Sequence, residues 1–328
     1  MKRNVLIIML LGSFLMVPIN SDAHSPKNRV NVMTNDASLK SMPVNKEIEE
    51  LLKKAEQGDV ESMYKLGKCY DKEKNYAEAI KWYRKGAENG NGAAAYELGV
   101  SYDYGCGVEK NNEEANKWYR KGAELGYGVA ARRLGQSYYV GIGVEKNPAE
   151  ANKWYRKAVE LGDGVAATYL GNNYDRGIGV ERNYEEARVW YRKAVELGDG
   201  AGAYFLGYHY QKGFGVEKNP AEENKWYRKG AELGNGSSAL SLGLNYYNGI
   251  GVEKNPAEAN KWYRKAAELG EGEAAYFLGI NHYEGNGVEK NLSEAKKWAK
   301  KALELGYSDA AELLSAIEKR ETMSRLGI

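Results

Sequence analysis

The spacing of the tryptophans constrains this chain more than any other feature of its sequence. All seven tryptophans of the 328-residue chain recur at an interval of 36 residues, at Trp82, Trp118, Trp154, Trp190, Trp226, Trp262 and Trp298. A fixed period of this length indicates a tandem array, in which each repeat buries its apolar face against its neighbours. The 39 glycines also recur at fixed phases, so they mark repeated turns and not low complexity.

One repeat can be described over residues 128 to 162. Val129 to Tyr139 has the pattern of a first helix, Gly141 to Val144 forms a turn, and Asn147 to Leu161 predicts a second helix that Gly162 ends. An Asn-x-x-Glu signal opens the second helix in all seven repeats. The asparagine can accept from free amides of the first turn, and we expect the glutamate to reach back to the cap amide.

The first helix carries Leu-Gly at its centre in every repeat, as at Leu134-Gly135. A glycine there costs about 1 kcal/mol against alanine, so its recurrence predicts a close approach of the second helix. The matching small residue is an alanine, such as Ala151, except in repeat five, where Glu223 replaces it. We expect Glu223 to reach the edge of the helix pair or to force the helices apart. The tryptophan and the tyrosine after it are predicted to fill the space between successive repeats.

The chain begins with a targeting signal. Lys2 and Arg3 precede an apolar run from Val5 to Val17, and Ser21 to Ala23 fits a small-x-small cleavage site before His24. The alternative is a membrane anchor, but the run is shorter than the ~20 residues that span a bilayer. The predicted organisation is a signal peptide (1–23), a flexible leader (24–44), an N-terminal capping helix (45–58), seven repeats (59–306) and a C-terminal capping helix (307–328).

Leu-Gly and tyrosine on one helix, with alanine and an aromatic on the next, resemble the tetratricopeptide repeat. The longer period and the Gly-x-Gly-Val turn before Asn-x-x-Glu-Ala are similar to the Sel-1-like variety, over residues 59 to 306. The resemblance implies an all-α, right-handed superhelical solenoid that scaffolds protein complexes. Some exported bacterial members are cysteine-rich, with a disulfide in each repeat, and weak penicillin-binding or lactamase activity is attributed to them. This chain has two cysteines, so it departs from that pattern.

In tetratricopeptide geometry the first helix of each repeat lines an inner, concave wall. The positions that this geometry exposes vary between repeats here and are rich in tyrosine, with charges of both signs. Tyrosine and arginine are frequent anchors of protein interfaces. The candidate partner-binding residues are Tyr96, Tyr104, Arg132, Gln136, Tyr139, Asn172, Arg176, Tyr204, Tyr208, Lys212, Tyr247 and Tyr276. The alternative is that these positions are an unconstrained surface.

Signals for catalysis are weak. Gly126 to Ala131 spells a dinucleotide fingerprint, but it follows a helix and recurs with the period, so we expect no cofactor. His282 occupies a tyrosine phase and His209 precedes a core tyrosine, so both are interpreted as packing residues. No spacing suggests a catalytic triad or a metal site. Cys69 and Cys106 could form one disulfide in an exported chain, or could remain two thiols.

These observations predict an exported, non-enzymatic scaffold, periplasmic or secreted, that binds a protein or peptide. A net charge of +2 gives no reason to expect nucleic acid or stable membrane insertion. Envelope assembly, toxin immunity and host interaction remain open as its role, and a monomer is favoured. The alternative class is an enzyme that acts weakly on β-lactams or peptidoglycan precursors.

The cleavage site yields a direct prediction. If a peptidase cuts after Ala23, the mature protein begins at His24. N-terminal sequencing of the exported protein should therefore start at His24, and exported material that still begins at Met1 would contradict the prediction.

Overall fold

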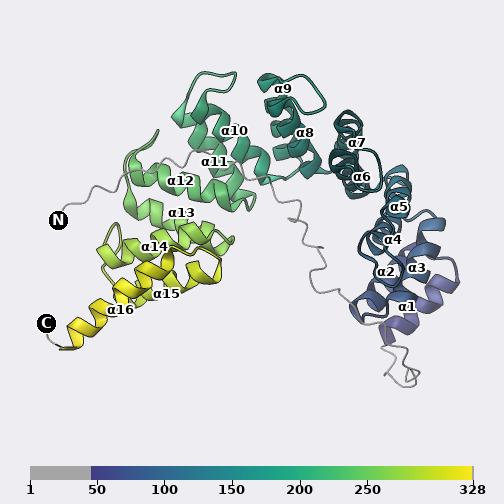
Figure 1. Ribbon diagram of the computed structural model, residues 1–328, viewed down its shortest axis with the longest axis horizontal. Helices are drawn as coiled ribbons and strands as arrows, with labels where there is room; N and C mark the ends of the chain where they lie inside the picture. The colour runs from purple at the N-terminus through teal and green to yellow at the C-terminus, as the bar shows by residue number, and fades with distance from the viewer. Residues whose placement is uncertain (1–45, 327–328) are drawn as a thin grey trace.

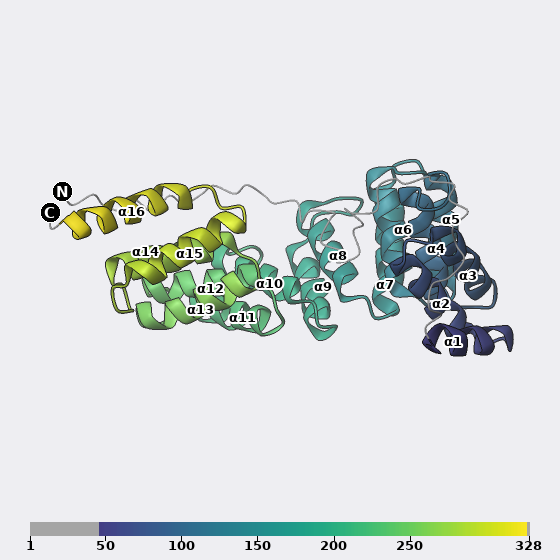
Figure 2. The same ribbon diagram turned by 90° about the horizontal axis from the view of Figure 1, so that it is seen from below.

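The computed structural model describes residues 46–326, which form sixteen α-helices and no strand in that range. The helices follow one another in pairs along an open arc (Figures 1 and 2). They are α1 (Lys46–Glu56), α2 (Val60–Lys72), α3 (Tyr76–Glu88), α4 (Gly92–Tyr104), α5 (Asn112–Glu124), α6 (Gly128–Val140), α7 (Pro148–Glu160), α8 (Gly164–Arg176), α9 (Tyr184–Glu196), α10 (Gly200–Lys212), α11 (Pro220–Glu232), α12 (Gly236–Asn248), α13 (Pro256–Glu268), α14 (Gly272–Glu284), α15 (Leu292–Glu304) and α16 (Ala310–Leu326). The predicted all-α solenoid is confirmed.

The asparagine caps form as the sequence indicates. The Asn147 side chain accepts from the Glu150 amide at 3.0 Å, and the same contact opens the odd-numbered helix of every repeat. The expectation that Glu150 reaches back to the cap amide is wrong. The Asn147 amide donates to the Tyr138 carbonyl at 2.8 Å, and the Glu150 carboxylate pairs with Lys153 instead. The cap therefore also ties the turn to the preceding helix.

The glycine at the centre of each even-numbered helix from α2 to α12 makes room for a tyrosine ring. A Cβ at Gly135 would lie 2.6 Å from Cε1 of Tyr155, which is 3% exposed, and 3.2 Å from the Ala151 carbonyl oxygen. The close approach predicted from the glycine is present, but a tyrosine and not the alanine fills it. The same tyrosine also contacts the following repeat, as expected, because the ring of Tyr155 lies 5.4 Å from that of Tyr169 on α8.

The tryptophan does lie between repeats. The Arg120 guanidinium on α5 lies 4.8 Å from the Trp154 ring centre on α7. The same arginine donates to the Tyr138 hydroxyl on α6 at 3.1 Å. One arginine thus contacts both helices of the following pair, and Arg84 makes equivalent contacts with Tyr102 and Trp118. Such cation–π contacts contribute about 0.5–2 kcal/mol each.

A buried asparagine adds a second link between repeats. Asn152 on α7 donates to the Ile178 carbonyl at 2.9 Å and accepts from Asn173 at 2.6 Å. Ile178 and Asn173 both belong to the next repeat. The Asn152 amide therefore forms hydrogen bonds with both the turn and the even-numbered helix of that repeat. In repeat four, Arg188 takes this position and donates to the Phe214 carbonyl at 2.7 Å.

The two ends of the array are built differently. Repeat one lacks the glycine turn, and Lys74 takes a left-handed φ of 62° where the other repeats use glycine. In repeat seven Ala299 replaces the tyrosine. Leu313 of α16 lies against Gly279 where the other repeats have the tyrosine ring. The predicted signal peptide and leader, residues 1–44, lie outside the described residues. Within those residues, no helix is long and apolar enough to cross a membrane.

The difference at Gly279 gives a matched pair of substitutions. Gly135→Ala should lower the free energy of unfolding, because the cost of overpacking, about 1–3 kcal/mol, exceeds the helix-propensity gain of about 1 kcal/mol. Gly279→Ala should be neutral or stabilising, because its methyl group meets the far end of the Leu313 side chain, 2.9 Å away. Urea denaturation followed by circular dichroism measures both. Equal effects would show that the tyrosine ring does not set the distance between the helices.

Candidate partner-binding surface

The even-numbered helices α4 to α14 carry all twelve candidate residues. Direct contacts join α2 to α4, α4 to α6, α8 to α10 and α10 to α12, so repeats approach one another on this side of the array. From α2 to α9, Figure 1 shows these helices nearer the inside of the arc than their odd-numbered partners. We use the name inner wall for the exposed and partly buried side of the even-numbered helices, α2 to α16.

The structure divides the candidates by exposure. Tyr96, Arg132 and Gln136 are buried, at 4%, 5% and 8% exposure, so the prediction that they are exposed is wrong. Tyr104, Arg176 and Lys212 are exposed, and the partly buried members are Tyr139, Asn172, Tyr204, Tyr208, Tyr247 and Tyr276. The buried three are covered because their side chains contact the following repeat.

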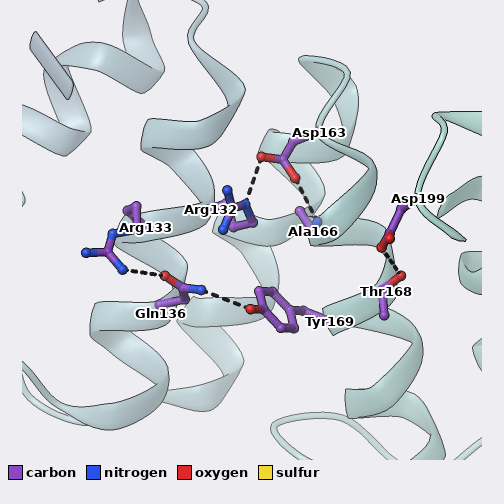
Figure 3. A network of polar contacts seen from close by, with 8 residues as sticks. All are labelled: Arg132, Arg133, Gln136, Asp163, Ala166, Thr168, Tyr169 and Asp199. Atoms are coloured by element: carbon purple, nitrogen blue, oxygen red, sulfur yellow. Dashed lines mark hydrogen bonds and ion pairs between the residues drawn. The ribbon is translucent and has the colours of Figure 1, made fainter. Parts of the chain in front are cut away.

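Arg132 shows how the following repeat covers a wall residue. Its Nε donates to Asp163 Oδ2 at 2.9 Å, and both side chains are 6% exposed (Figure 3). Asp163 also caps α8 by accepting from the Ala166 amide. In the next repeat, Thr168 donates to Asp199, the cap of α10, at 2.6 Å. The residue at this position therefore holds the start of the next even-numbered helix.

A second network crosses repeats two to four. Arg133 Nη2 donates to Asp103 Oδ2 of the preceding repeat at 3.2 Å, and its Nη1 donates to Gln136 Oε1 at 3.3 Å. Gln136 in turn donates to the Tyr169 hydroxyl at 3.2 Å (Figure 3). Sequence reasoning missed Arg133, Asp103 and Tyr169 as members of the wall. The signal in the sequence was the spacing of Asp103 and Arg133, which are 30 residues apart. Here the carboxylate precedes the arginine, whereas Asp163 follows Arg132.

Repeat five presents aromatic rings to the wall. The Tyr204 ring lies 5.8 Å from that of Tyr227 and 6.5 Å from that of Tyr208. The Lys212 ammonium lies 5.5 Å from the Tyr208 ring centre. Tyr208 also packs edge-on against Phe214 of the glycine turn, at 5.8 Å. The rings are thus supported from behind while Tyr204 and Tyr208 keep part of their surface exposed.

His209 lies behind these rings and is fully buried. Its ring makes edge contacts with Tyr184, Tyr191 and Phe214, and its Nε2 lies 3.2 Å from Asp175 Oδ1. These contacts agree with the interpretation of His209 as a packing residue. His282 is also buried, at 9% exposure. Among the described residues, no group of histidine, cysteine and carboxylate side chains could hold a metal ion.

Glu223 lies between repeats five and six and is 1% exposed. Its Oε1 accepts from Gln211 at 2.9 Å and from Asn245 at 2.8 Å. Neither expected outcome holds, because two amides satisfy the carboxylate inside the array. Burial raises the pKa of the Glu223 carboxyl above its usual value of 4.5, and the two hydrogen bonds oppose that shift.

The two cysteines lie at the start of the array. Cys69 is partly buried in α2, and Cys106 is buried in the turn that follows α4. Pairing of Cys69 with Cys106 stays a prediction.

Helix pairs that stack through repeated contacts define the class of this protein, an α/α solenoid. The Sel1 repeat family model matches residues 60–91, 92–127, 128–163, 164–199, 200–235, 236–271 and 272–307, so the chain belongs to the Sel1 repeat family. The resemblance seen in the sequence is confirmed.

Solved structures of the same fold are similar to this chain. A protective antigen of uropathogenic Escherichia coli strains, with an SLR fold, is 35% identical, with 83% of this chain and 67% of that chain covered and a TM-score of 0.58. A Sel1 repeat protein from Oxalobacter formigenes is 37% identical, with 73% and 96% covered and a TM-score of 0.60. Helicobacter pylori cysteine rich protein B is 33% identical, with 40% and 96% covered and a TM-score of 0.35. No curated protein matches the sequence.

The buried carboxylate predicts a pH dependence. A carboxyl whose pKa is raised by folding destabilises the folded state as pH rises above its unfolded value of 4.5. The unfolding free energy of the wild type, relative to Glu223→Gln, should therefore fall between pH 4.5 and pH 7. Urea titrations at several pH values measure the difference. Glu223→Ala, which restores the alanine of the other repeats, should remove the same pH dependence, and a constant difference would refute the assignment.

Proposed function

We propose that this protein is an exported, non-enzymatic scaffold that binds a protein or peptide partner on its inner wall. The observation that carries the proposal is the contrast along the even-numbered helices. The glycine and leucine phases repeat and are buried, while Tyr204, Tyr208 and Tyr247 vary from repeat to repeat and keep exposed surface. Variation at accessible positions of an otherwise uniform array favours recognition over packing.

The chemistry of the wall supports a protein partner. Partly exposed tyrosine rings supply large contact areas with few rotatable bonds, and they are frequent hot spots of interfaces. Tyr204 and Tyr208 are already held by Tyr227 and Phe214, so little entropy would be lost when a partner orders them. Arg176 and Lys212 add exposed charge beside the rings. The surface is thus preorganised for binding.

Export is part of the proposal because the N-terminal sequence has the features of a cleavable signal. The E. coli relative is described as a protective antigen, which supports a role at or beyond the cell envelope. Envelope assembly, toxin immunity and host interaction are the candidate roles, and the family fold favours none of them. The partner can be found by affinity capture from the envelope fraction and mass spectrometry.

Replacement of the two central tyrosines tests the binding surface. Tyr204→Ala with Tyr208→Ala should weaken binding of the captured partner by about thirtyfold, the loss that corresponds to about 2 kcal/mol for a buried anchor. The helical circular dichroism should stay unchanged. Lys225→Ala, an exposed change on α11, is the matched control and should bind normally. Normal binding by the tyrosine variant, with loss in the control, would place the partner on the odd-numbered helices.

A further inference from the structure

Charged side chains that the inner wall leaves available gather in two groups, one basic and one acidic. Several wall charges are neutralised inside the array: Lys68 pairs with Glu97 at 2.8 Å, Arg133 with Asp103 at 3.2 Å and Arg132 with Asp163 at 2.9 Å. These pairs hold successive repeats together, so they are not free to meet a ligand.

Two basic side chains remain available at the centre of the array. Arg176 ends α8 and Lys212 ends α10, and both are exposed. Within residues 46–326, no carboxylate lies within ion-pair distance of either one. The α8 and α10 helices contact each other directly, which places the two residues at equivalent positions on neighbouring rows of the wall. The Tyr208 ring lies beside Lys212.

Acidic side chains gather at the starts of α14 and α16, at the other end of the wall, while the exposed Arg320 lies further along α16 beside the Tyr283 ring. Glu271 immediately precedes α14, where its Oε1 accepts from the Ser237 hydroxyl at 2.8 Å, Glu273 lies in the first turn of α14, and Asp309 immediately precedes α16. Burial, followed by the charges of Glu271 and Asp309, raises the pKa of the Glu273 carboxyl, so the three carboxylates lie close enough to repel one another. The rings of Tyr276 and Tyr307 lie 5.1 Å apart, and burial together with the charge of Asp309 raises the pKa of both hydroxyls.

Apolar and aromatic groups occupy the rows between. Tyr204 and Tyr208 belong to α10, and Leu244 and Tyr247 belong to α12, and all four are partly buried. Along the wall the order is therefore basic, then aromatic, then acidic. A cation at the acidic end would meet both carboxylates and tyrosine rings, and it would relieve the repulsion among the carboxylates.

We propose that the inner wall binds an extended peptide segment with acidic side chains at one end, apolar side chains in the middle and basic side chains at the other. Its acidic end lies over α8 and α10, and its basic end lies over α14 and α16. Helix rows are about 8–10 Å apart, so three rows span roughly 25–30 Å. The basic residues end their helices and the acidic residues lie where theirs begin, which adds an offset of about 15–18 Å along the helix axis. The diagonal is then roughly 28–35 Å, and an extended chain that rises about 3.3 Å per residue covers it with about nine to eleven residues. The inference rests on the proposed function of the inner wall.

Synthetic peptides of one composition test the charge order. The probes are a peptide with glutamates at one end, leucines in the centre and lysines at the other, the same order reversed, and an isomer in which glutamate and lysine alternate. Fluorescence anisotropy with the full chain measures their binding. One segregated peptide should bind at least about tenfold more tightly than the alternating isomer at low salt, and salt should reduce the difference.

Charge reversals locate the contact. Arg176→Glu with Lys212→Glu should remove the preference for the segregated peptide. Lys153→Glu with Lys225→Glu makes the same change in net charge on exposed positions of α7 and α11, and it should keep the preference. Glu273→Lys with Asp309→Lys should instead favour a peptide that is acidic at both ends.

The outcomes separate this inference from the proposed function. Equal binding of all isomers, lost on replacement of Tyr204 and Tyr208 by alanine, overturns the charge order and leaves the wall as the binding surface. No binding of any peptide overturns the inference as well, and the captured partner then decides the function independently. If the preference for the segregated peptide persists in the Arg176 and Lys212 variant but is lost in the Lys153 and Lys225 control, both the charge order and the inner wall as binding surface are overturned.

Discussion

In repeats one to six, the two helices of each pair are held at a distance set by a tyrosine ring that lies against a glycine. The ring of Tyr155 occupies the space where a side chain at position 135 would stand, and its exposure of 3% shows how completely the pair closes over it. Because the contact recurs in six repeats, successive pairs have nearly the same shape. Uniform pairs can stack through the same few links, which is the condition for a regular solenoid.

The links between pairs are polar and specific. An arginine reaches a tyrosine hydroxyl and a tryptophan ring of the next repeat, and a buried asparagine satisfies the carbonyl of the next turn. Such bonds require a defined offset between neighbours, because an amide or guanidinium that missed its acceptor would be buried without a partner. Repeat five tolerates a buried carboxylate at Glu223 for the same reason, since Gln211 and Asn245 both donate to it.

The inner wall follows from this arrangement. The fifth residues of α4 and α6, Tyr96 and Arg132, are drawn into the junction with the next repeat, so they contribute to the array and not to an open surface. In repeat five the equivalent Tyr204 contacts other rings and keeps part of its surface exposed. Tyr104 on α4 and Tyr139 on α6 stay accessible, and the other groups left for recognition lie between α8 and α16. Their chemistry is aromatic in the middle and charged at either end.

The sequence by itself determined the period, the helix boundaries and the turns, because caps, glycines with positive φ and apolar spacing act within a few residues of the chain. It also located the close approach at Gly135. Only the tertiary structure decided that Tyr155 fills it, since the sequence offered an alanine and a tyrosine on the same helix. It likewise decided which wall residues are accessible. The exposure of Arg132 depends on Asp163, 31 residues later, and that contact exists only when neighbouring repeats stack.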